Sequence, residues 1–222
     1  MKKITTAVLS LTLLLGISTF SFGQDYYSSE KLYKDMNLKG IINKEAFNNA
    51  IEGFNKIENK KKDIITIIDY TKPSNEKRFY VIDLEKEKIL FDSYVAHGKN
   101  SGDLWTTSFS NKIGSKETSL GFFLTENTYI GRNGYSLRLE GLEKGINDNA
   151  FTRTIVVHGA TYANKNFIDS TGRLGRSWGC PAIPKKISKK VIDTIKDGSV
   201  IFAYGNNTRY ALNSKLIDDP SA

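Results

Sequence analysis

Cysteine and histidine are scarce in this 222-residue chain, which contains one cysteine and two histidines. A single cysteine excludes an internal disulfide, and the three side chains together are too few for a convincing zinc site. The chain also lacks a His-Glu-Xaa-Xaa-His motif, the helical zinc-binding signature of many metalloproteases. The sequence therefore predicts no metal and no cofactor, and it directs attention to the lone thiol, Cys180.

Long apolar runs are equally scarce, and the longest lies at the N-terminus. Lys2 and Lys3 precede an apolar stretch over residues 4–17, and Ser21 and Gly23 offer small residues for cleavage. This is the layout of a secretory signal peptide, and the run is short for a membrane-spanning helix. We therefore expect a signal peptide over 1–23 and an exported protein of the periplasm or cell envelope. We expect no transmembrane segment in the mature chain.

Acidic residues are outnumbered, with 24 Asp and Glu against 32 Lys and Arg, which gives a net charge of +8. A basic surface fits an anionic envelope polymer, lipid headgroups or nucleic acid, and it does not choose among them. An exported chain meets little nucleic acid, so we expect no nucleic-acid partner. The apolar content of 39% is high enough for a packed core and too high for a disordered chain.

Many short apolar segments separated by glycine-containing turns predict a mostly-β domain, either a β-sandwich or an open barrel, over 61–205. Apolar spacings of three and four predict an N-terminal helical segment over 24–60, with Asn43 as an N-cap, and one helix after Cys180, over 185–196. The polar C-terminal tail, 206–222, is expected to fray. The expected strands are 64–68, 79–84, 88–96, 120–125, 135–139, 153–157 and 199–204.

Cys180 follows His158 by 22 residues, and each lies next to a glycine. A cysteine nucleophile needs a base for its proton and donors for the oxyanion. We expect His158 to end its strand and act as that base, with the Gly159 carbonyl fixing the tautomer of the imidazole. The backbone N–H groups of Gly179 and Cys180 are the expected oxyanion donors.

Two segments carry a family resemblance: His158-Gly159-Ala160, and Ser177 to Cys180 in the form Ser-Xaa-Gly-Cys. Together they resemble the L,D-transpeptidase catalytic domain (the YkuD-like fold), the cysteine enzymes that remodel bacterial peptidoglycan. The similarity covers about 64–204 and includes 95–99 and 119–123. The form of 176–182 and 134–139 is most similar to the branch of murein L,D-transpeptidases.

The chain departs from the commoner family motif at two positions. Trp178 stands where that motif has a histidine, and Ala182 stands where it has an arginine. The resemblance therefore leaves His97 as a possible replacement for the histidine, and Arg173 or Arg176 as a replacement for the arginine, which would hold a substrate carboxylate. Ser177 and Trp178 complete the predicted substrate-binding residues.

The resemblance implies acyl transfer from a peptidoglycan stem peptide. The bond before the terminal D-alanine is cleaved through a Cys180 thioester, and the acyl group passes to an amine or to water. Carbapenem-type inhibitors are then expected to react with the thiol. Three alternatives remain open: L,D-carboxypeptidase activity as the main reaction, a sortase-like transpeptidase that uses His97 as its histidine, and a catalytically inactive wall-binding module.

Overall fold

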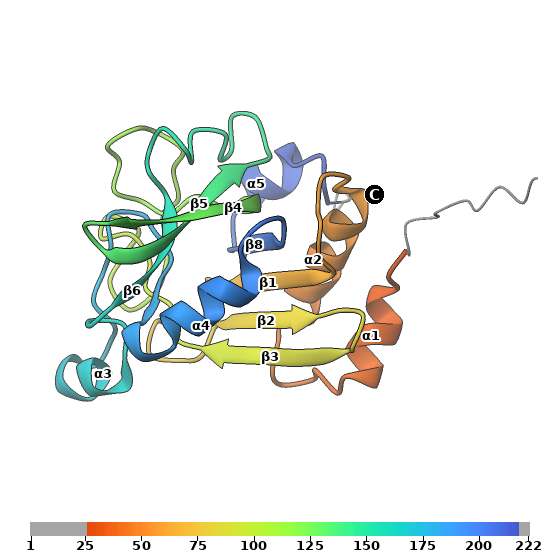
Figure 1. Cartoon of the computed structure of the whole chain (residues 1–222), viewed down its shortest axis with the longest axis horizontal. Coiled ribbons are helices and arrows are strands. Elements are labelled where there is room, and N and C mark those ends of the chain that lie inside the picture. The colour runs from red at the N-terminus through yellow and green to blue at the C-terminus, as the bar shows by residue number, and fades with distance from the viewer. Residues whose placement is uncertain (1–25, 218–222) are drawn as a thin grey trace, which may run out of the picture.

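The computed structural model describes residues 26–217, and this part of the chain opens with two helices (Figure 1). α1 spans Ser29–Asp35 and α2 spans Lys44–Lys56. As predicted, Asn43 caps α2, because its Oδ1 accepts a hydrogen bond from the Ala46 backbone N–H at 3.1 Å. The predicted signal peptide lies outside the described residues and stays a prediction.

Eight strands of the described chain form one sheet in the order β3-β2-β1-β8-β4-β5-β6-β7. Their bounds are Ile64–Asp69 (β1), Phe79–Asp83 (β2), Lys88–Ser93 (β3), Gly121–Gly131 (β4), Gly134–Gly141 (β5), Val156–Ala160 (β6), Ala182–Pro184 (β7) and Val200–Tyr204 (β8). β1 runs parallel to β8, and β6 runs parallel to β7, whereas the other neighbours are antiparallel. The predicted hairpin of β2 and β3 is confirmed.

The segment that follows β3 links the two edges of this sheet. Ala96 forms an antiparallel bridge with Ala182 of β7, and its backbone N–H donates to the Ala182 carbonyl at 2.8 Å. Gly98 forms a parallel bridge with Ser177, two residues further along the chain. The sheet is therefore nearly closed, which confirms a mostly-β fold of the open-barrel type and not a two-sheet sandwich.

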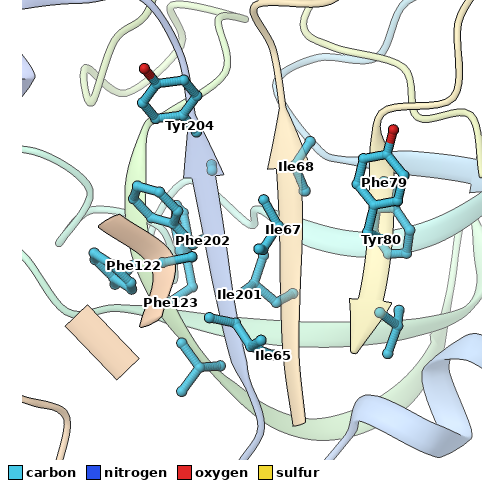
Figure 2. Packing of buried hydrophobic residues seen from close by; sticks show 14 of the residues in the cluster. Ile65, Ile67, Ile68, Phe79, Tyr80, Phe122, Phe123, Ile201, Phe202 and Tyr204 are labelled. Atoms are coloured by element: carbon cyan, nitrogen blue, oxygen red, sulfur yellow. The ribbon is translucent and has the colours of Figure 1, made fainter. Parts of the chain in front are cut away.

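The main core lies where β1, β2, β4 and β8 meet α2. Figure 2 shows the aromatic rings of Phe122 and Phe202 beside the isoleucines of β1 and β8. These two rings stack with their centroids 4.3 Å apart. Gly53 of α2 lies directly over Phe122, since a Cβ added there would lie 2.1 Å from the ring. This close approach fixes the N-terminal helix against the sheet.

Three parts of the chain differ from expectation. β6 begins at Val156 and not at residue 153, so His158 lies in the middle of the strand and not at its end. A helix that was not among the predicted elements, α3, spans Lys165–Thr171 between β6 and Cys180. The tail expected to fray contains α5, Thr208–Asn213, which the buried ring of Tyr210 anchors to the core. The predicted helix after Cys180 is confirmed as α4, Lys185–Ile195.

Candidate active site

Cys180 lies at the end of a tight turn that Ser177 closes. The Ser177 hydroxyl donates to the Cys180 carbonyl at 2.6 Å and accepts from the Gly179 backbone N–H at 3.1 Å. This turn bears on two of the predicted site residues. Ser177 lines the same cavity as Cys180 but is buried, and its hydroxyl is engaged within the turn. The Gly179 N–H is already bonded, so the Cys180 N–H is the one of the expected pair without an acceptor among the described residues.

Gly179 is required by the backbone of the turn. Its φ of +120° is a conformation that residues with a side chain rarely adopt. A Cβ added there would lie 2.7 Å from the Glu117 carbonyl oxygen, which belongs to the loop before β4. Gly179 therefore lets the loop over 110–119 lie directly against the cysteine turn.

His158 projects from β6, which lies beside β7. It pairs with Ala182 of β7, two residues after Cys180, and its ring Nδ1 lies 3.1 Å from the Gly159 carbonyl oxygen. An Nδ1–H donated to that carbonyl leaves Nε2 as the unprotonated nitrogen, which is the tautomer a general base needs. The geometry matches the expected role of Gly159. The same glycine makes room for α4, because an added Cβ would lie 2.4 Å from Ser188 Oγ.

Cys180 and His158 open onto one cavity of about 720 Å³, which Trp178, Arg176 and Tyr162 also line. The thiol donates to the Thr154 carbonyl at 3.5 Å and lies beside β6. Trp178 is 65% exposed, and the Lys116 ammonium lies 5.1 Å from the centroid of its ring. The structure therefore places Trp178 at an exposed edge of the cavity, as a substrate-binding residue requires.

Burial sets the resting charge states of both groups. It raises the pKa of the Cys180 thiol, while a hydrogen bond with the backbone of Val156 and the charge of Arg153 lower that pKa. Burial also lowers the pKa of His158 below its ordinary value, although the hydrogen bond with Gly159 opposes this effect. At rest the pair is therefore a neutral thiol and a neutral imidazole, so a thiolate forms when the proton moves.

His97 does not reach the cavity, which corrects its expected role. It is 1% exposed, and its Nδ1 accepts from the Arg78 guanidinium at 2.8 Å while its Nε2 lies 3.2 Å from the Gly102 carbonyl. Burial and the Arg78 charge lower the pKa of His97 to about 4. With both ring nitrogens occupied, His97 is a neutral structural residue.

The two arginines predicted to bind a carboxylate are held by other groups. Arg176 lines the cavity, but its Nη1 lies 2.6 Å from the Asp103 carboxylate. Arg173 does not line the cavity, and its Nη1 donates to the Leu174 carbonyl at 2.7 Å. Asp103 therefore already pairs with Arg176, and Arg173 lies outside the described lining of the cavity.

The cavity lining also includes residues that sequence reasoning missed, among them Lys116, Arg132, Arg153 and Tyr162. Lys116, Arg132 and Arg153 make the cavity wall cationic, and no acidic side chain belongs to the described lining. Burial and a nearby Cys180 raise the pKa of Tyr162 to about 12, so its hydroxyl stays protonated. Tyr162 follows His158 by four residues, so its closeness in sequence could have suggested a place near the site. Lys116 and Arg132 lie in distant loops, where no motif indicates such a place.

Metal and membrane signatures are both absent from residues 26–217. No three His, Cys, Asp or Glu side chains gather there as a metal ion would require. No helix in this range has the length and apolar character needed to cross a membrane.

The fold and the site together define a class of protein: a nearly closed β-barrel in which a thiol and an imidazole face one cavity. The family model described as L,D-transpeptidase catalytic domain matches residues 38–204. This chain belongs to that family, as the resemblance predicted. A search of curated proteins found no match.

Solved structures of L,D-transpeptidases are similar to this chain at low identity. One from Mycobacterium smegmatis is 14% identical over 65% of this chain and 59% of its own, with a TM-score of 0.41. One solved in complex with imipenem is 15% identical over 64% of this chain and 59% of its own, with a TM-score of 0.40. One from Stackebrandtia nassauensis is 18% identical over 80% and 76%, with a TM-score of 0.39. This chain thus spans 59% of the length of the first two.

Proposed function

We propose that this chain is a cysteine-dependent peptidoglycan L,D-transpeptidase that forms a thioester on Cys180. Family membership supports the class of reaction. The observation that carries the assignment is His158, whose Nδ1 is bonded to Gly159 while its ring opens onto the cavity that holds the sole thiol. Export directed by residues 1–23 belongs to the proposal, because peptidoglycan lies in the cell envelope.

In the first half-reaction, the thiol leaves the Thr154 carbonyl and gives its proton to Nε2 of His158. The sulfur attacks the carbonyl carbon that precedes the terminal D-alanine of a stem peptide. A sulfur–carbon bond forms, the carbon–nitrogen bond breaks, and His158 returns the proton to the departing D-alanine amine. The product is a thioester on Cys180 with the enzyme otherwise unchanged.

We assign the oxyanion of this step to two donors. The Cys180 backbone N–H has no acceptor among the described residues. The Tyr162 hydroxyl also has no hydrogen-bond partner within 26–217, and Tyr162 lines the cavity together with Cys180, whose charge acts on its pKa. Donors that are already oriented toward developing charge lower the barrier without reorganisation.

In the second half-reaction, an amine of a neighbouring stem or a water molecule attacks the thioester. His158 takes the proton of the attacking group, and the sulfur leaves as a thiolate that is then protonated. An amine acceptor produces a cross-link, and water produces L,D-carboxypeptidase activity. The cationic lining suits a donor whose terminal D-alanine carries a carboxylate.

The test is the reaction of purified mature protein with a disaccharide-tetrapeptide and, separately, with a carbapenem. We expect release of D-alanine or formation of cross-linked dimers, and a carbapenem adduct visible as an intact-mass increase at Cys180. Cys180→Ala removes the nucleophile and should abolish both results, while Arg209→Gln on the exposed surface of α5 serves as a control. Turnover that survives in Cys180→Ala would rule out the mechanism.

Two rival assignments predict different results in the same assays. If His97 were the active histidine, as in a sortase-like enzyme, its replacement would cost more activity than replacement of His158. We expect the reverse, because both ring nitrogens of His97 already have partners. Binding of peptidoglycan with neither turnover nor adduct would identify an inactive wall-binding module.

A further inference from the structure

Arg153 lies against the cysteine turn. It lines the same cavity as Cys180, and it stands three residues before β6, the strand of His158. A Cβ added to Gly179 would lie 3.3 Å from its Nη2, so the guanidinium is adjacent to the backbone that carries the thiol. The half-buried position of Arg153 limits the water that can screen its charge.

The hydrogen-bond partners of this guanidinium are all neutral oxygens. Nη1 donates to the Ser110 carbonyl at 2.6 Å and to the Ser119 hydroxyl, and Nη2 donates to the Glu117 carbonyl at 2.6 Å and to the Ser115 hydroxyl at 3.1 Å. No carboxylate of the described residues lies within the 4.0 Å of an ion pair, in contrast to Arg176 with Asp103.

A partly buried cation without a counter-ion is costly unless an anion forms beside it. The hydrogen bonds to the loop over 110–119 hold the group in place without cancelling its charge. The structure therefore contains a fixed positive charge next to the one thiol of the chain.

We propose that Arg153 is a positioning residue that stabilises the thiolate of Cys180 through its fixed charge and holds the loop over 110–119 against the cysteine turn. The proposal rests on the proposed function only in taking Cys180 as the nucleophile. This role belongs to a residue ahead of the histidine strand, and it differs from the binding of a substrate carboxylate that was predicted for Arg173 or Arg176.

Other charged or titratable groups surround the thiol and must be considered with it. His158 and Tyr162 lie on β6 and the turn after it, and Tyr70 lies at the end of β1. The loop before β4 carries Lys116 and Glu117, the β4–β5 turn carries Arg132, and the cysteine turn carries Arg176. The Glu117 carboxylate is bonded to the Ser108 hydroxyl. Arg153 is the cation that lowers the pKa of Cys180, and Cys180 in turn raises that of Arg153.

The test is the pH dependence of Cys180 alkylation by iodoacetamide, followed by intact mass in the full mature chain. No second thiol competes, because the sequence has a single cysteine. Arg153→Gln removes the charge and keeps an amide that can bond the loop. We expect its reactivity midpoint to rise by about one pH unit or more, the size of effect that a close opposite charge has on a pKa. Arg153→Lys retains the charge and should stay close to wild type.

Two variants control for loop anchoring and for arginine loss in general. Ser115→Ala removes one anchor of the guanidinium without changing the charge, and Arg209→Gln removes an exposed arginine on α5; neither should move the midpoint. If Arg153→Gln folds and keeps the wild-type midpoint, or if Arg153→Lys shifts as far as Arg153→Gln, the proposal is wrong.

A folding failure of Arg153→Gln still leaves a decisive measurement. Arg153→Met also removes the charge but keeps an unbranched side chain that can pack beside the cysteine turn, so its midpoint should rise as well; a folded Arg153→Met with the wild-type midpoint would contradict the proposal. Alkylation requires no peptidoglycan, so its result is separable from the proposed function. If the midpoints are as expected but the protein shows neither turnover nor a carbapenem adduct, the proposed role of Arg153 stands and the transpeptidase assignment is wrong.

Discussion

Replacement of Gly159 by alanine tests how closely the histidine strand packs on α4. An added Cβ would lie 2.4 Å from Ser188 Oγ, 2.9 Å from Ser188 Cβ and 3.2 Å from Lys185 Cα, so α4 must move away from β6. Overpacking of this kind costs about 1–3 kcal/mol. A loss of about 2 kcal/mol corresponds to a fall in Tm of roughly 4–8 °C for a domain of this size.

Ser188→Gly supplies the matched partner for a double-mutant cycle, because it removes two of the three close atoms. Alone it should cost about 1 kcal/mol, since glycine is unfavourable inside a helix. In the double variant the overlap is relieved. Its loss in free energy of unfolding should therefore be about 1–2 kcal/mol smaller than the sum of the losses in the two single variants. Urea unfolding measures all four proteins. Strictly additive losses would refute the packing explanation.

The same cycle has a chemical readout, because the Gly159 carbonyl fixes the His158 ring. A displaced β6 weakens that hydrogen bond and moves Nε2 relative to Cys180. We expect Gly159→Ala to lower the turnover of disaccharide-tetrapeptide by roughly tenfold to a hundredfold, with partial recovery in the double variant. Unchanged turnover in a folded but less stable Gly159→Ala would refute the orienting role of Gly159.

Three further predictions concern buried or unpaired polar groups. The pKa of His97 is about 4, against 6.5 for a free histidine, so neutral His97 contributes its full stabilisation above pH 6.5. Up to about 3 kcal/mol of the free energy of unfolding is lost as pH falls through 4. His97→Gln should flatten this pH dependence, measured by urea unfolding. Burial raises the pKa of Glu143 above 4.5, so its contribution is present below pH 4.5 and is lost as pH rises through the higher value; Glu143→Gln should remove this decline in Tm. Tyr162→Phe should lower kcat and leave Cys180 alkylation unchanged, whereas equal turnover would remove Tyr162 from the oxyanion site.

The meeting of His158 and Cys180 at one cavity could be predicted because its signals are local in sequence. A β-branched run identified the strand of His158, and the glycines beside His158 and Cys180 marked the close approaches that the structure shows. Apolar periodicity likewise predicted α2 and α4, whose buried faces recur at spacings of three and four. Strand pairing followed from a short charged turn only for the hairpin of β2 and β3.

The remaining features depend on contacts between distant segments. Nothing local to His97 shows that Arg78 will occupy its Nδ1, and nothing local to Arg176 shows that Asp103 will neutralise it. The tail was expected to fray because it is polar, but Tyr210 anchors α5 in the core and contacts the buried Glu143. In each case a partner far away in sequence decides whether a polar side chain is free or committed.

The role of Trp178 likewise depends on its surroundings in the structure. An indole does not titrate, so it cannot replace the histidine of the commoner motif as a proton-transfer group. Its exposed ring can pack against substrate, and the Lys116 ammonium over its face adds positive charge at that edge of the cavity. In the proposed mechanism Arg153 is the cation held against the cysteine turn. His158 is then the one imidazole facing the cavity, so the acid limb of the pH–rate profile should show a single ionisation, with a pKa below the 6.5 of a free histidine.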